Sequence, residues 1–476
     1  MKVLLVTSHH RLVNSRWMPL GPCYIGALLK KNGHSVRIFD RLVEHHRAHG
    51  NADSVQNRMK SIILQFMPDI IGLSTTSRSI YDTVNCIAFI RDFYDGLIVA
   101  GGYHATAMPT ESFNKIRGLD AIIVGEGEYP LLHLLDYERR SVSGILWKDD
   151  DPGKPIVPYR VSNLDSLPFP DMDLLDTDYY RQADTATIRG FNLRSVSLLT
   201  SRGCLNKCYF CSESLTFGSG VRYNSPEYVI ENIAWVLNKY DINGIYFHDN
   251  DFLSAPDRVV EICRHIVNRG YHKRVEWCIQ ARSDNINKQV LKELKRAGCV
   301  KIEIGIESLV QQHLNDIGKR VKSSDQVYAL HLCRKHGIRA HGYLMHGYNH
   351  ETIDSLEEEF RRIKRLPLDS ITWSVMKASP GTKFYLDYGN KYFENNEWSE
   401  AAIETYYTKK TFSSLSEDEK EKWMKRYFIP FAKRKARYSL LRNNGFMFFM
   451  QRIIKKISKS FSTKCKPQRP DNPIQK

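Results

Sequence analysis

The sequence lacks any apolar run long enough to cross a membrane. No stretch of about 18 consecutive apolar residues occurs in its 476 positions, which argues against a spanning helix. Met1 leads directly into the strand-like run Val3–Val6, without a basic and then apolar leader or a small-residue cleavage site. We therefore expect a cytoplasmic protein. Internal repeats and low-complexity segments are also absent, and 42% hydrophobic with 26% charged residues is a globular composition.

The main part of the chain also lacks an excess of positive charge. The net charge is +16, but residues 421–476 hold 16 basic and 2 acidic residues, which leaves 53 basic and 51 acidic residues before them. A protein that grips nucleic acid with its catalytic body spreads basic residues over that body. We therefore expect no nucleic-acid partner.

Residues 1 to about 136 alternate short apolar runs with amphipathic stretches. The runs are rich in Val, Ile and Leu: Val3–Val6, Val36–Phe39, Ile70–Leu73, Leu97–Ala100 and Ala121–Val124. Ile25–Lys31 and Tyr81–Phe93 repeat apolar residues every three or four positions, as helices do. The alternation predicts a doubly wound, Rossmann-like parallel sheet, with a ligand crevice at the carboxyl ends of its strands.

A turn at Asp149–Gly153 and an extended Leu-Pro-Phe-Pro segment at Leu167–Pro170 interrupt this pattern. From about 191 a second series of strands begins: Ser195–Thr200, Gly244–His248, Val275–Gln280, Lys301–Ile306, Arg339–Met345 and Ser370–Met376. Helical stretches separate them, so we predict a partial (β/α)6 barrel with its chemistry at the strand carboxyl ends. The expected divisions are a first domain at 1–140, a linker at 141–190, the barrel at 191–390 and a helical C-terminal region with a basic tail at 391–476.

Three of the ten cysteines crowd into one loop after the first barrel strand. Cys204, Cys208 and Cys211 have the spacing C-x3-C-x2-C, and thiolates suit iron–sulfur clusters, zinc or copper. The chain lacks a fourth cysteine at partner spacing, whereas structural zinc and electron-transfer clusters take four protein ligands. Three thiolates leave one iron of a cubane cluster open to another ligand. A zinc knuckle completed by a distant histidine is the alternative, and the loop's position on a barrel strand favours the catalytic cluster.

These cysteines, with Phe210 before the third, resemble the signature of the radical S-adenosylmethionine superfamily. The resemblance implies that they hold a 4Fe–4S cluster whose open iron takes the amine and carboxylate of S-adenosylmethionine. It further implies a flavodoxin or ferredoxin-type electron donor and a 5′-deoxyadenosyl radical that abstracts hydrogen from a small-molecule substrate. The candidate cofactor contacts, in order after successive strands, are Phe210, Asp249, Asp251, Arg282, Glu307 and Ser308. Carboxylates suit an ammonium, an arginine suits a carboxylate, and acceptors suit ribose hydroxyls.

The first domain resembles the cobalamin-binding domain that precedes the barrel in many of these enzymes. Met18–Gly21, Ala100–Thr106 and Val124–Glu128 carry this resemblance, which with the barrel covers about residues 1–390. The cobalamin-binding candidates are Ser8, Thr75, Gly101, Gly102, His104, Glu126 and Gly127. Position 130 is a proline and no third glycine follows, so a dinucleotide-binding loop is excluded.

One departure concerns the axial histidine of cobalamin. Domains that supply it carry D-x-H-x-x-G after the first strand, and the stretch here, residues 7–12 (Thr-Ser-His-His-Arg-Leu), lacks both Asp and Gly. We therefore expect cobalamin without a protein histidine ligand, and His104 as a residue lining the crevice. A vestigial domain that binds no cobalamin is the alternative.

The C-terminal tail carries an amphipathic basic pattern. Apolar residues recur at helical spacing with basic residues between them: Phe446, Met450, Ile453, Ile454, Ile457 and Phe461, with Arg452, Lys455, Lys456 and Lys459. Such a helix can lie on an anionic membrane as a peripheral contact, or it can pack on the barrel with its lysines solvated. The second placement is slightly favoured.

The two resemblances together imply a cobalamin-dependent radical S-adenosylmethionine enzyme, and we interpret it as a C-methyltransferase. One S-adenosylmethionine would methylate cob(I)alamin, and a second would supply the radical that lets an unactivated carbon take the methyl group from methylcobalamin. A non-methylating oxidative cyclase of the same domain order is the first alternative, and a non-catalytic iron–sulfur and corrinoid sensor or electron-transfer protein is the second. Arg78, Trp17, Trp373, Tyr343 and the residues after 391 are candidates for the substrate pocket.

Overall fold

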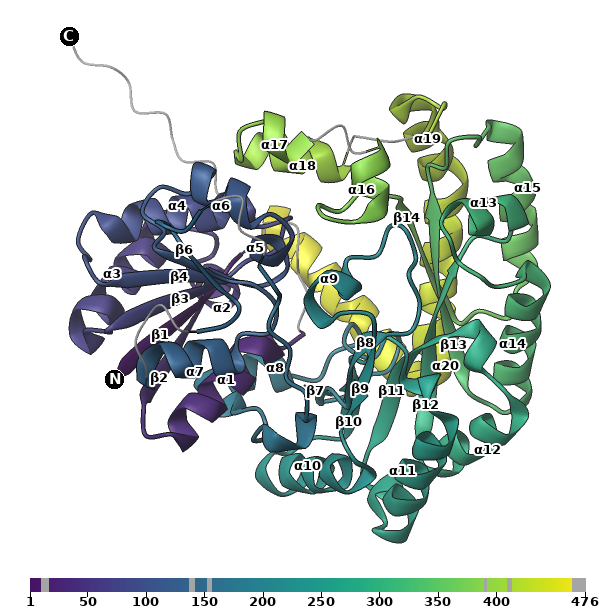
Figure 1. Cartoon of the computed structure of the whole chain (residues 1–476). Helices are drawn as coiled ribbons and strands as arrows, with labels where there is room; N and C mark the ends of the chain where they lie inside the picture. Colours follow the sequence, from purple (N-terminus) through teal and green to yellow (C-terminus); the bar gives the residue numbers. More distant parts are fainter. Residues whose placement is uncertain (10–16, 137–141, 152–155, 389–391, 409–412, 465–476) are drawn as a thin grey trace.

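The computed structural model describes residues 1–464 except 10–16, 137–141, 152–155, 389–391 and 409–412. Figure 1 shows two α/β bodies side by side, each built on its own six-stranded sheet, with further helices beside the second. This agrees with the fold class that the alternating pattern predicts.

The first sheet has the order β2-β1-β3-β4-β5-β6. Its strands are β1 (Lys2–Thr7), β2 (Ser35–Asp40), β3 (Ile70–Ser74), β4 (Leu97–Gly101), β5 (Ala121–Ile123) and β6 (Ile145–Trp147). The first five are parallel and match the five predicted strands. The antiparallel β6 was missed, because three residues carry too little pattern, and it lies in the range assigned to the linker.

Helices cover both faces of this sheet. They are α1 (Leu20–Lys31), α2 (Arg41–Arg47), α3 (Ala52–Phe66), α4 (Ile80–Arg91), α5 (Tyr103–Ala107), α6 (Pro109–Lys115) and α7 (Glu128–Asp136). Alternate residues of β1 enter two different cores: Val3 and Leu5 pack with α1 and α7, whereas Leu4 and Val6 pack with α3 and α4. β1 lies between β2 and β3, so the strand order reverses direction at β1. At such a point the neighbouring connections run to opposite sides, which opens a crevice at the carboxyl ends of the strands.

The second sheet has six parallel strands in the order β7-β10-β11-β12-β13-β14, which is a partial barrel. They are β7 (Ser195–Leu198), β10 (Gly244–Phe247), β11 (Glu276–Arg282), β12 (Cys299–Glu307), β13 (Arg339–His346) and β14 (Ser370–Val375). The helices between them are α10 (Pro226–Lys239), α11 (Pro256–Asn268), α12 (Lys288–Arg296), α13 (Gln311–Asp316), α14 (Ser323–Lys335) and α15 (Ile353–Arg365). All six predicted barrel strands are confirmed.

A hairpin interrupts the barrel after its first strand. β8 (Ser201–Cys204) pairs antiparallel with β9 (Gly220–Tyr223), and α9 (Glu213–Phe217) lies between them. We call this unit, residues 201–223, the cysteine hairpin. The sequence pattern did not predict it, because its strands are short and glycine-containing.

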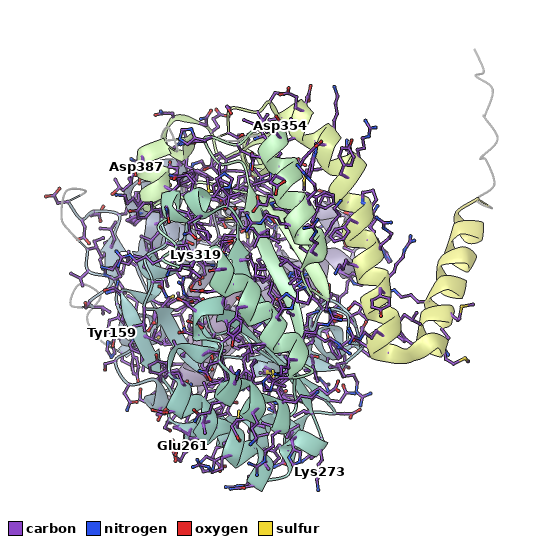
Figure 2. All side chains as sticks on the ribbon, turned by 90° about the vertical axis from the view of Figure 1, so that its right-hand side faces the viewer. Tyr159, Glu261, Lys273, Lys319, Asp354 and Asp387 are labelled. Atoms are coloured by element: carbon purple, nitrogen blue, oxygen red, sulfur yellow. The ribbon has the colours of Figure 1, made fainter. Side chains whose placement is uncertain are left out.

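The C-terminal region is helical, as predicted. After α8 (Thr177–Arg181) in the connecting segment, the remaining helices follow the barrel: α16 (Lys383–Tyr388), α17 (Tyr392–Asn395), α18 (Glu400–Thr408), α19 (Glu417–Trp423) and α20 (Ile429–Lys464). The first arm of α20 packs along the edge strand β14. The helix bends at Gly445, which has a φ of 81°, and Figure 2 shows the second arm standing away from the body.

The predicted amphipathic pattern of the tail falls largely outside the described residues, because the side chains of Phe446 and 453–464 are among those not placed. Among the described helices, none has the length and apolar composition that a membrane crossing requires.

A buried charge pair within the barrel, Lys301 with Asp369, also binds α20 through Ser439, and the loss of Asp369 should destabilise the fold. Asp369 accepts hydrogen bonds from Ser439 Oγ at 2.5 Å and from Lys301 Nζ at 3.4 Å, and the Lys301 side chain is completely buried. We expect Asp369→Ala to lower the free energy of unfolding by about 3 kcal/mol, since it leaves a buried ammonium without its carboxylate. Urea titration checks this. The control Asp241→Ala, which breaks the exposed pair with Arg194, should cost less than about 0.5 kcal/mol, and an equal loss in both variants would contradict the prediction.

Candidate functional site

The three cysteines lie together on the loop between β8 and α9. Cys204 ends β8, and all three side chains are partly exposed. Two backbone hydrogen bonds of Tyr209 fix the loop from other parts of the barrel: Tyr209 N donates to Ile317 O, and Phe384 N donates to Tyr209 O, both at 2.9 Å. The loop is therefore held against the segments that follow β12 and β14, over the carboxyl end of the barrel.

Two thiols of this loop, Cys208 and Cys211, have raised pKa values. Burial raises the pKa of Cys208, and burial together with the Glu213 carboxylate raises that of Cys211 to about 12. At Cys208 the positive charges of Lys319 and Arg282 act in the opposite direction and lower the pKa, and Arg282 Nη1 lies 3.9 Å from Cys208 Sγ. A metal centre here must displace the thiol protons when it binds, as thiolate sites do.

Two of the expected cofactor contacts, Asp251 and Arg282, lie side by side near the cysteines. Arg282 ends β11 and forms a bidentate pair with Asp284 at 2.9 and 3.0 Å. Asp251 Oδ1 accepts from Arg282 N at 3.2 Å, and its Oδ2 accepts from Asn285 at 2.6 Å. Burial raises the pKa of Asp251 to about 6.

Glu307 meets a buried lysine that the sequence did not point to. Lys319 Nζ lies 3.0 Å from Glu307 Oε1 and also donates to Gly305 O. Glu307 has a φ of 63°, a left-handed conformation that is uncommon outside glycine and that turns the chain at the end of β12. No local pattern marks Lys319, which follows α13 in a loop, so only the fold brings it here.

Asp249 and Ser308, also expected to contact the cofactor, are occupied within the protein. Asp249 is fully buried and accepts hydrogen bonds from Thr200 N at 2.7 Å, Thr200 Oγ1 at 2.5 Å and Ser201 N at 2.9 Å. Ser308 donates to Glu359 at 2.6 Å. Asp249 thus fixes the turn between β7 and β8. Phe210 packs on the apolar core that underlies the first domain and the C-terminal helices.

A cavity of about 350 Å³ lies at the carboxyl ends of β1, β3, β4 and β5. Five of the expected cobalamin-binding residues line it: Thr75, Gly101, Gly102, Glu126 and Gly127. The cysteine hairpin closes its other side through Arg202, Thr216 and Phe217. The crevice predicted for the first domain is therefore shared with the hairpin that carries the cysteines.

Gly102 and Gly125 are required by close approaches of the backbone to itself. Gly102 has a φ of 99°, and a Cβ there would lie 2.6 Å from Thr75 O. Gly125 has a φ of 94°, and its Cβ would lie 2.3 Å from Tyr159 O. A Cβ on Gly101 would meet only ordinary contacts, the nearest at 3.7 Å from Ile123. The geometry of the two left-handed glycines shapes the crevice wall.

His104 and His9 are not among the residues that line the crevice. His104 was expected to line the crevice, but it is fully buried against Trp398 and Phe393, with Nδ1 2.9 Å from Ser77 Oγ. Burial lowers its pKa to about 3. The ring of His9 stacks on His45 with their centroids 4.2 Å apart. Residues 10–12, which complete the departing motif, lie outside the described part of the chain.

Ser8 directly follows β1, and its Oγ is 2.6 Å from Ser79 Oγ.

Among the substrate-pocket candidates, Trp373 is not in the barrel interior, because it is buried outside the sheet against Phe360, Trp423 and Phe428. The Arg78 guanidinium lies over the ring of Tyr407, 5.0 Å from its centroid.

The barrel interior holds a connected polar network around Glu303. Tyr246 Oη donates to Glu303 at 3.0 Å, Tyr343 Oη also donates to it, and Gln280 Nε2 donates to Tyr246 at 2.8 Å. Arg189 pairs with Glu303 at 3.2 Å. Barrel interiors are usually filled by branched apolar residues, so this polar layer is unusual.

Trp17 extends from the first body to this network. Its ring stacks with Tyr246 at a centroid distance of 5.8 Å, meets His248 edge-on at 5.2 Å, and has the Arg189 guanidinium over it at 5.9 Å. Sequence reasoning proposed Trp17 and Tyr343 separately. It missed Arg189, which precedes the barrel in an irregular segment and joins the two.

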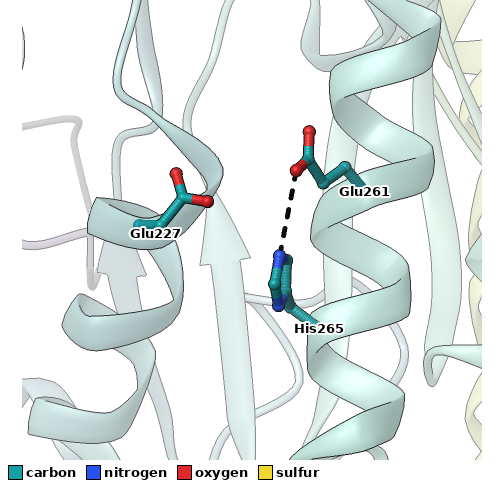
Figure 3. Close-up of side chains that lie close together, drawn as sticks. All are labelled: Glu227, Glu261 and His265. Carbon is teal, nitrogen blue, oxygen red and sulfur yellow. Dashed lines mark ion pairs between the residues drawn. The ribbon is translucent and has the colours of Figure 1, made fainter.

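A second group of polar side chains lies on the outer surface, between α10 and α11. Glu227, Glu261 and His265 bring one ligand atom each within 4.8 Å of the others, and Glu261 and His265 form an i,i+4 pair at 3.9 Å (Figure 3). These are partly to fully exposed side chains, and an acidic surface cluster of this kind is ordinarily solvated.

Two family models match the chain. That of the radical SAM superfamily covers residues 198–363, and that of the B12 binding domain covers residues 11–135. The chain is a radical SAM enzyme with an N-terminal B12-binding domain. The cofactors that these two domains indicate are a 4Fe–4S cluster with S-adenosylmethionine and cobalamin, as the two resemblances implied.

The chain is similar over most of its length to proteins with different reactions. It is 29% identical to an uncharacterized methyltransferase of Pyrococcus horikoshii over 81% of this chain and 82% of the relative. It is 25% identical to an anaerobic magnesium-protoporphyrin IX monomethyl ester cyclase of Cereibacter sphaeroides, over 78% of this chain and 60% of the cyclase. The structure of the radical S-adenosylmethionine methyltransferase TsrM from Kitasatospora setae, with cobalamin and a [4Fe-4S] cluster bound, shares the fold with a TM-score of 0.68. Its sequence is 17% identical, and the match covers 87% of this chain and 88% of TsrM.

The two neighbouring glycines of the crevice should respond differently to alanine. We expect Gly102→Ala to lower the free energy of unfolding by about 1–3 kcal/mol, because its positive φ and the Thr75 carbonyl oppose a Cβ. Gly101→Ala, with ordinary contacts, should change stability by less than about 1 kcal/mol. Chemical denaturation of both variants measures the difference in their free energies of unfolding. Equal losses would show that the close approach of Thr75 O to Gly102 does not constrain the crevice wall.

Proposed function

We propose that this cobalamin-dependent radical SAM enzyme is a methyltransferase that adds a methyl group to an unactivated carbon of a small molecule. The observation that carries the proposal is the shared cavity. Its first-body wall is the B12-binding sheet, and its opposite wall is the cysteine hairpin, through Arg202, Thr216 and Phe217. A methyl carrier in the crevice and a radical source at the cysteines would thus serve one substrate between them.

In this proposal the protein binds and orients its cofactors with the residues already described. Cys204, Cys208 and Cys211 hold the cluster, and when S-adenosylmethionine is bound the cluster supplies one-electron cleavage of its sulfonium. Asp251 offers a carboxylate to the amine and Arg282 a guanidinium to the carboxylate, charge-assisted contacts that fix orientation. Glu307, Phe210 and Ser308 were predicted as further contacts, but the buried hydroxyl of Ser308 donates to Glu359, which also accepts from Leu309 N.

The crevice is the proposed cobalamin site. Thr75, Gly101, Gly102 and Gly127 line it, whereas Ser8 is not among the lining residues and stays a predicted contact. Since His104 is buried elsewhere and His9 stacks on His45, the structure supports cobalamin without a histidine ligand from these two residues.

The substrate in this proposal lies in the barrel interior beside the Glu303 network, where Trp17 and Arg189 are partly exposed. The flavodoxin or ferredoxin-type donor, the cytoplasmic location and the membrane contact of the basic C-terminal helix stay predictions from the sequence. The methyltransferase relative matches more of its own length than the cyclase does, which favours methylation over cyclisation.

Loss of single cysteines tests the catalytic proposal. We expect anaerobically reconstituted protein to bind four irons and to release 5′-deoxyadenosine from S-adenosylmethionine, and we expect Cys204→Ala, Cys208→Ala and Cys211→Ala each to abolish both. Cys333→Ala, in the buried face of α14, is the control and should retain iron and turnover. Iron analysis and chromatography give the readouts.

The reaction type follows from the product. Incubation with candidate substrates and methyl-deuterated S-adenosylmethionine should give a product that carries the labelled methyl group. An oxidised or cyclised product without it would establish the cyclase alternative, and an intact cluster that releases no 5′-deoxyadenosine would favour a sensor or electron-transfer protein.

A bulky side chain in the crevice should block cobalamin. Ser74 ends β3, lines the cavity and is half-buried, so Ser74→Phe fills the crevice while the core of the sheet stays intact. We expect retention of hydroxocobalamin after desalting to fall more than about tenfold, which is a loss of about 1.4 kcal/mol in binding free energy. The corrin absorbance measures it. Ser61→Phe, on the exposed side of α3, should bind as the wild type does, and normal binding by Ser74→Phe would place cobalamin elsewhere.

A further inference from the structure

We propose that a set of buried polar contacts between the two bodies, which we call the interdomain latch, sets the position of the cobalamin crevice relative to the cysteine loop. The latch consists of Arg202, Arg222 and Glu213 on the cysteine hairpin and Glu126, Glu128 and Tyr103 on the first body. The inference rests on the proposed function, because the proposed function places cobalamin in the crevice of the first body and the iron–sulfur cluster at the cysteine loop.

Two arginines of the hairpin face each other directly. Arg202 on β8 is the antiparallel partner of Arg222 on β9, and like charges in such a pair are destabilising. In the same register Cys204 is opposite Gly220. The hairpin therefore carries two cations at the ladder position two residues before the first cysteine, and these require carboxylates from elsewhere.

The turn between β5 and α7 supplies both carboxylates. Glu126 forms a bidentate pair with Arg222 at 2.5 and 2.9 Å and lies 3.4 Å from Arg202 Nη1. Glu128 accepts from Arg202 Nη2 at 2.7 Å. The side chains of Arg202, Glu126 and Glu128 are at most 6% exposed, so water does not screen these pairs. Tyr24 completes the contact, with the Arg202 guanidinium 5.2 Å from its ring centroid.

These contacts change the interpretation of Glu126. Its Oε2 accepts from Val161 N at 2.7 Å and from Arg222 Nη1 at 2.9 Å, and its Oε1 accepts from Arg222 Nη2 at 2.5 Å. Two of these three hydrogen bonds cross to the hairpin. We therefore assign Glu126 as a positioning residue that acts through the hairpin.

A second contact joins the bodies at the other end of the cysteine loop. Tyr103 follows Gly102 after β4. Its hydroxyl oxygen, Oη, lies 3.1 Å from both carboxylate oxygens of Glu213. Asn250 Nδ2 donates to Glu213 at 3.0 Å. Glu213 is two residues after Cys211, and Arg202 is two residues before Cys204. The latch thus holds the loop at both ends, from the turns after β4 and β5 that shape the crevice.

The position of the crevice relative to the cysteine loop matters, because groups bound at the two sites must come close enough to react with one substrate. A misplacement of about 1 Å can lower a rate about 100-fold when reacting groups must meet in one geometry. Directional pairs specify geometry in a way that apolar contact does not, since bidentate hydrogen bonds fix both distance and angle.

Pulsed EPR can measure this position without any turnover. Wild-type protein and variants are loaded with the iron–sulfur cluster and with hydroxocobalamin, and both centres are reduced to their paramagnetic states. The dipolar interaction between cob(II)alamin and the reduced cluster then reports their separation. Iron content, corrin absorbance and thermal unfolding are recorded for the same samples.

The variants separate positioning from stability. Tyr103→Phe removes one hydroxyl. Glu126→Gln leaves the buried Arg202 and the partly exposed Arg222 with one carboxylate between them. Adding Arg222→Gln removes the excess charge and should restore the unfolding temperature toward that of the wild type. Arg269→Gln, which breaks the exposed pair with Glu231, is the control.

We expect one narrow distance distribution for the wild type and for Arg269→Gln, and broader distributions for Tyr103→Phe, Glu126→Gln and the double variant at unchanged cofactor content. Restored stability with a broad distribution in the double variant is the signature of positioning. If Glu126→Gln fails to fold, Tyr103→Phe decides. Wild-type distributions in all variants would overturn the latch and leave the proposed function standing, whereas a wild type that loads no cobalamin would overturn both.

Discussion

The arrangement of the whole site depends on the sharp turn between β7 and β8, which the buried carboxylate of Asp249 stabilises. A parallel barrel strand would ordinarily continue into a helix on the outside of the barrel. Here three hydrogen bonds from Thr200 and Ser201 to Asp249 turn the chain into the cysteine hairpin instead. Because a buried acceptor without partners is costly, the turn and the carboxylate stabilise each other.

The consequence of this turn is that one hairpin serves two bodies. Its loop presents the cysteines over the barrel, while its strands and α9 close the crevice of the first sheet. The crevice itself depends on the order of the first sheet, in which β1 lies between β2 and β3. Two α/β bodies, each with its own sheet, are in this way brought to a common site next to the polar interior of the barrel.

The polar network in the barrel interior lies at the proposed substrate site. Glu303 is buried at the centre and is surrounded by Tyr246, Tyr343 and Arg189, so its charge is compensated within the barrel. Such a network is stable only when its members are satisfied together, which favours a single arrangement of the barrel mouth. Trp17 adds a surface from the first body, so both bodies contribute to the proposed substrate site.

Much of the fold and the central cysteine motif could be predicted from the sequence, because their signals are local. Alternating apolar runs gave the parallel strands of both sheets, and the spacing of Cys204, Cys208 and Cys211 identified the cluster loop within eight residues of chain. Only the tertiary structure decided which polar groups meet: Lys319 with Glu307, Arg189 with Trp17, Arg202 and Arg222 with Glu126, and His104 away from the crevice. These contacts join residues far apart or in irregular segments, where no periodic pattern records the partner, and the burial that decides each side chain's role is a property of the assembled bodies.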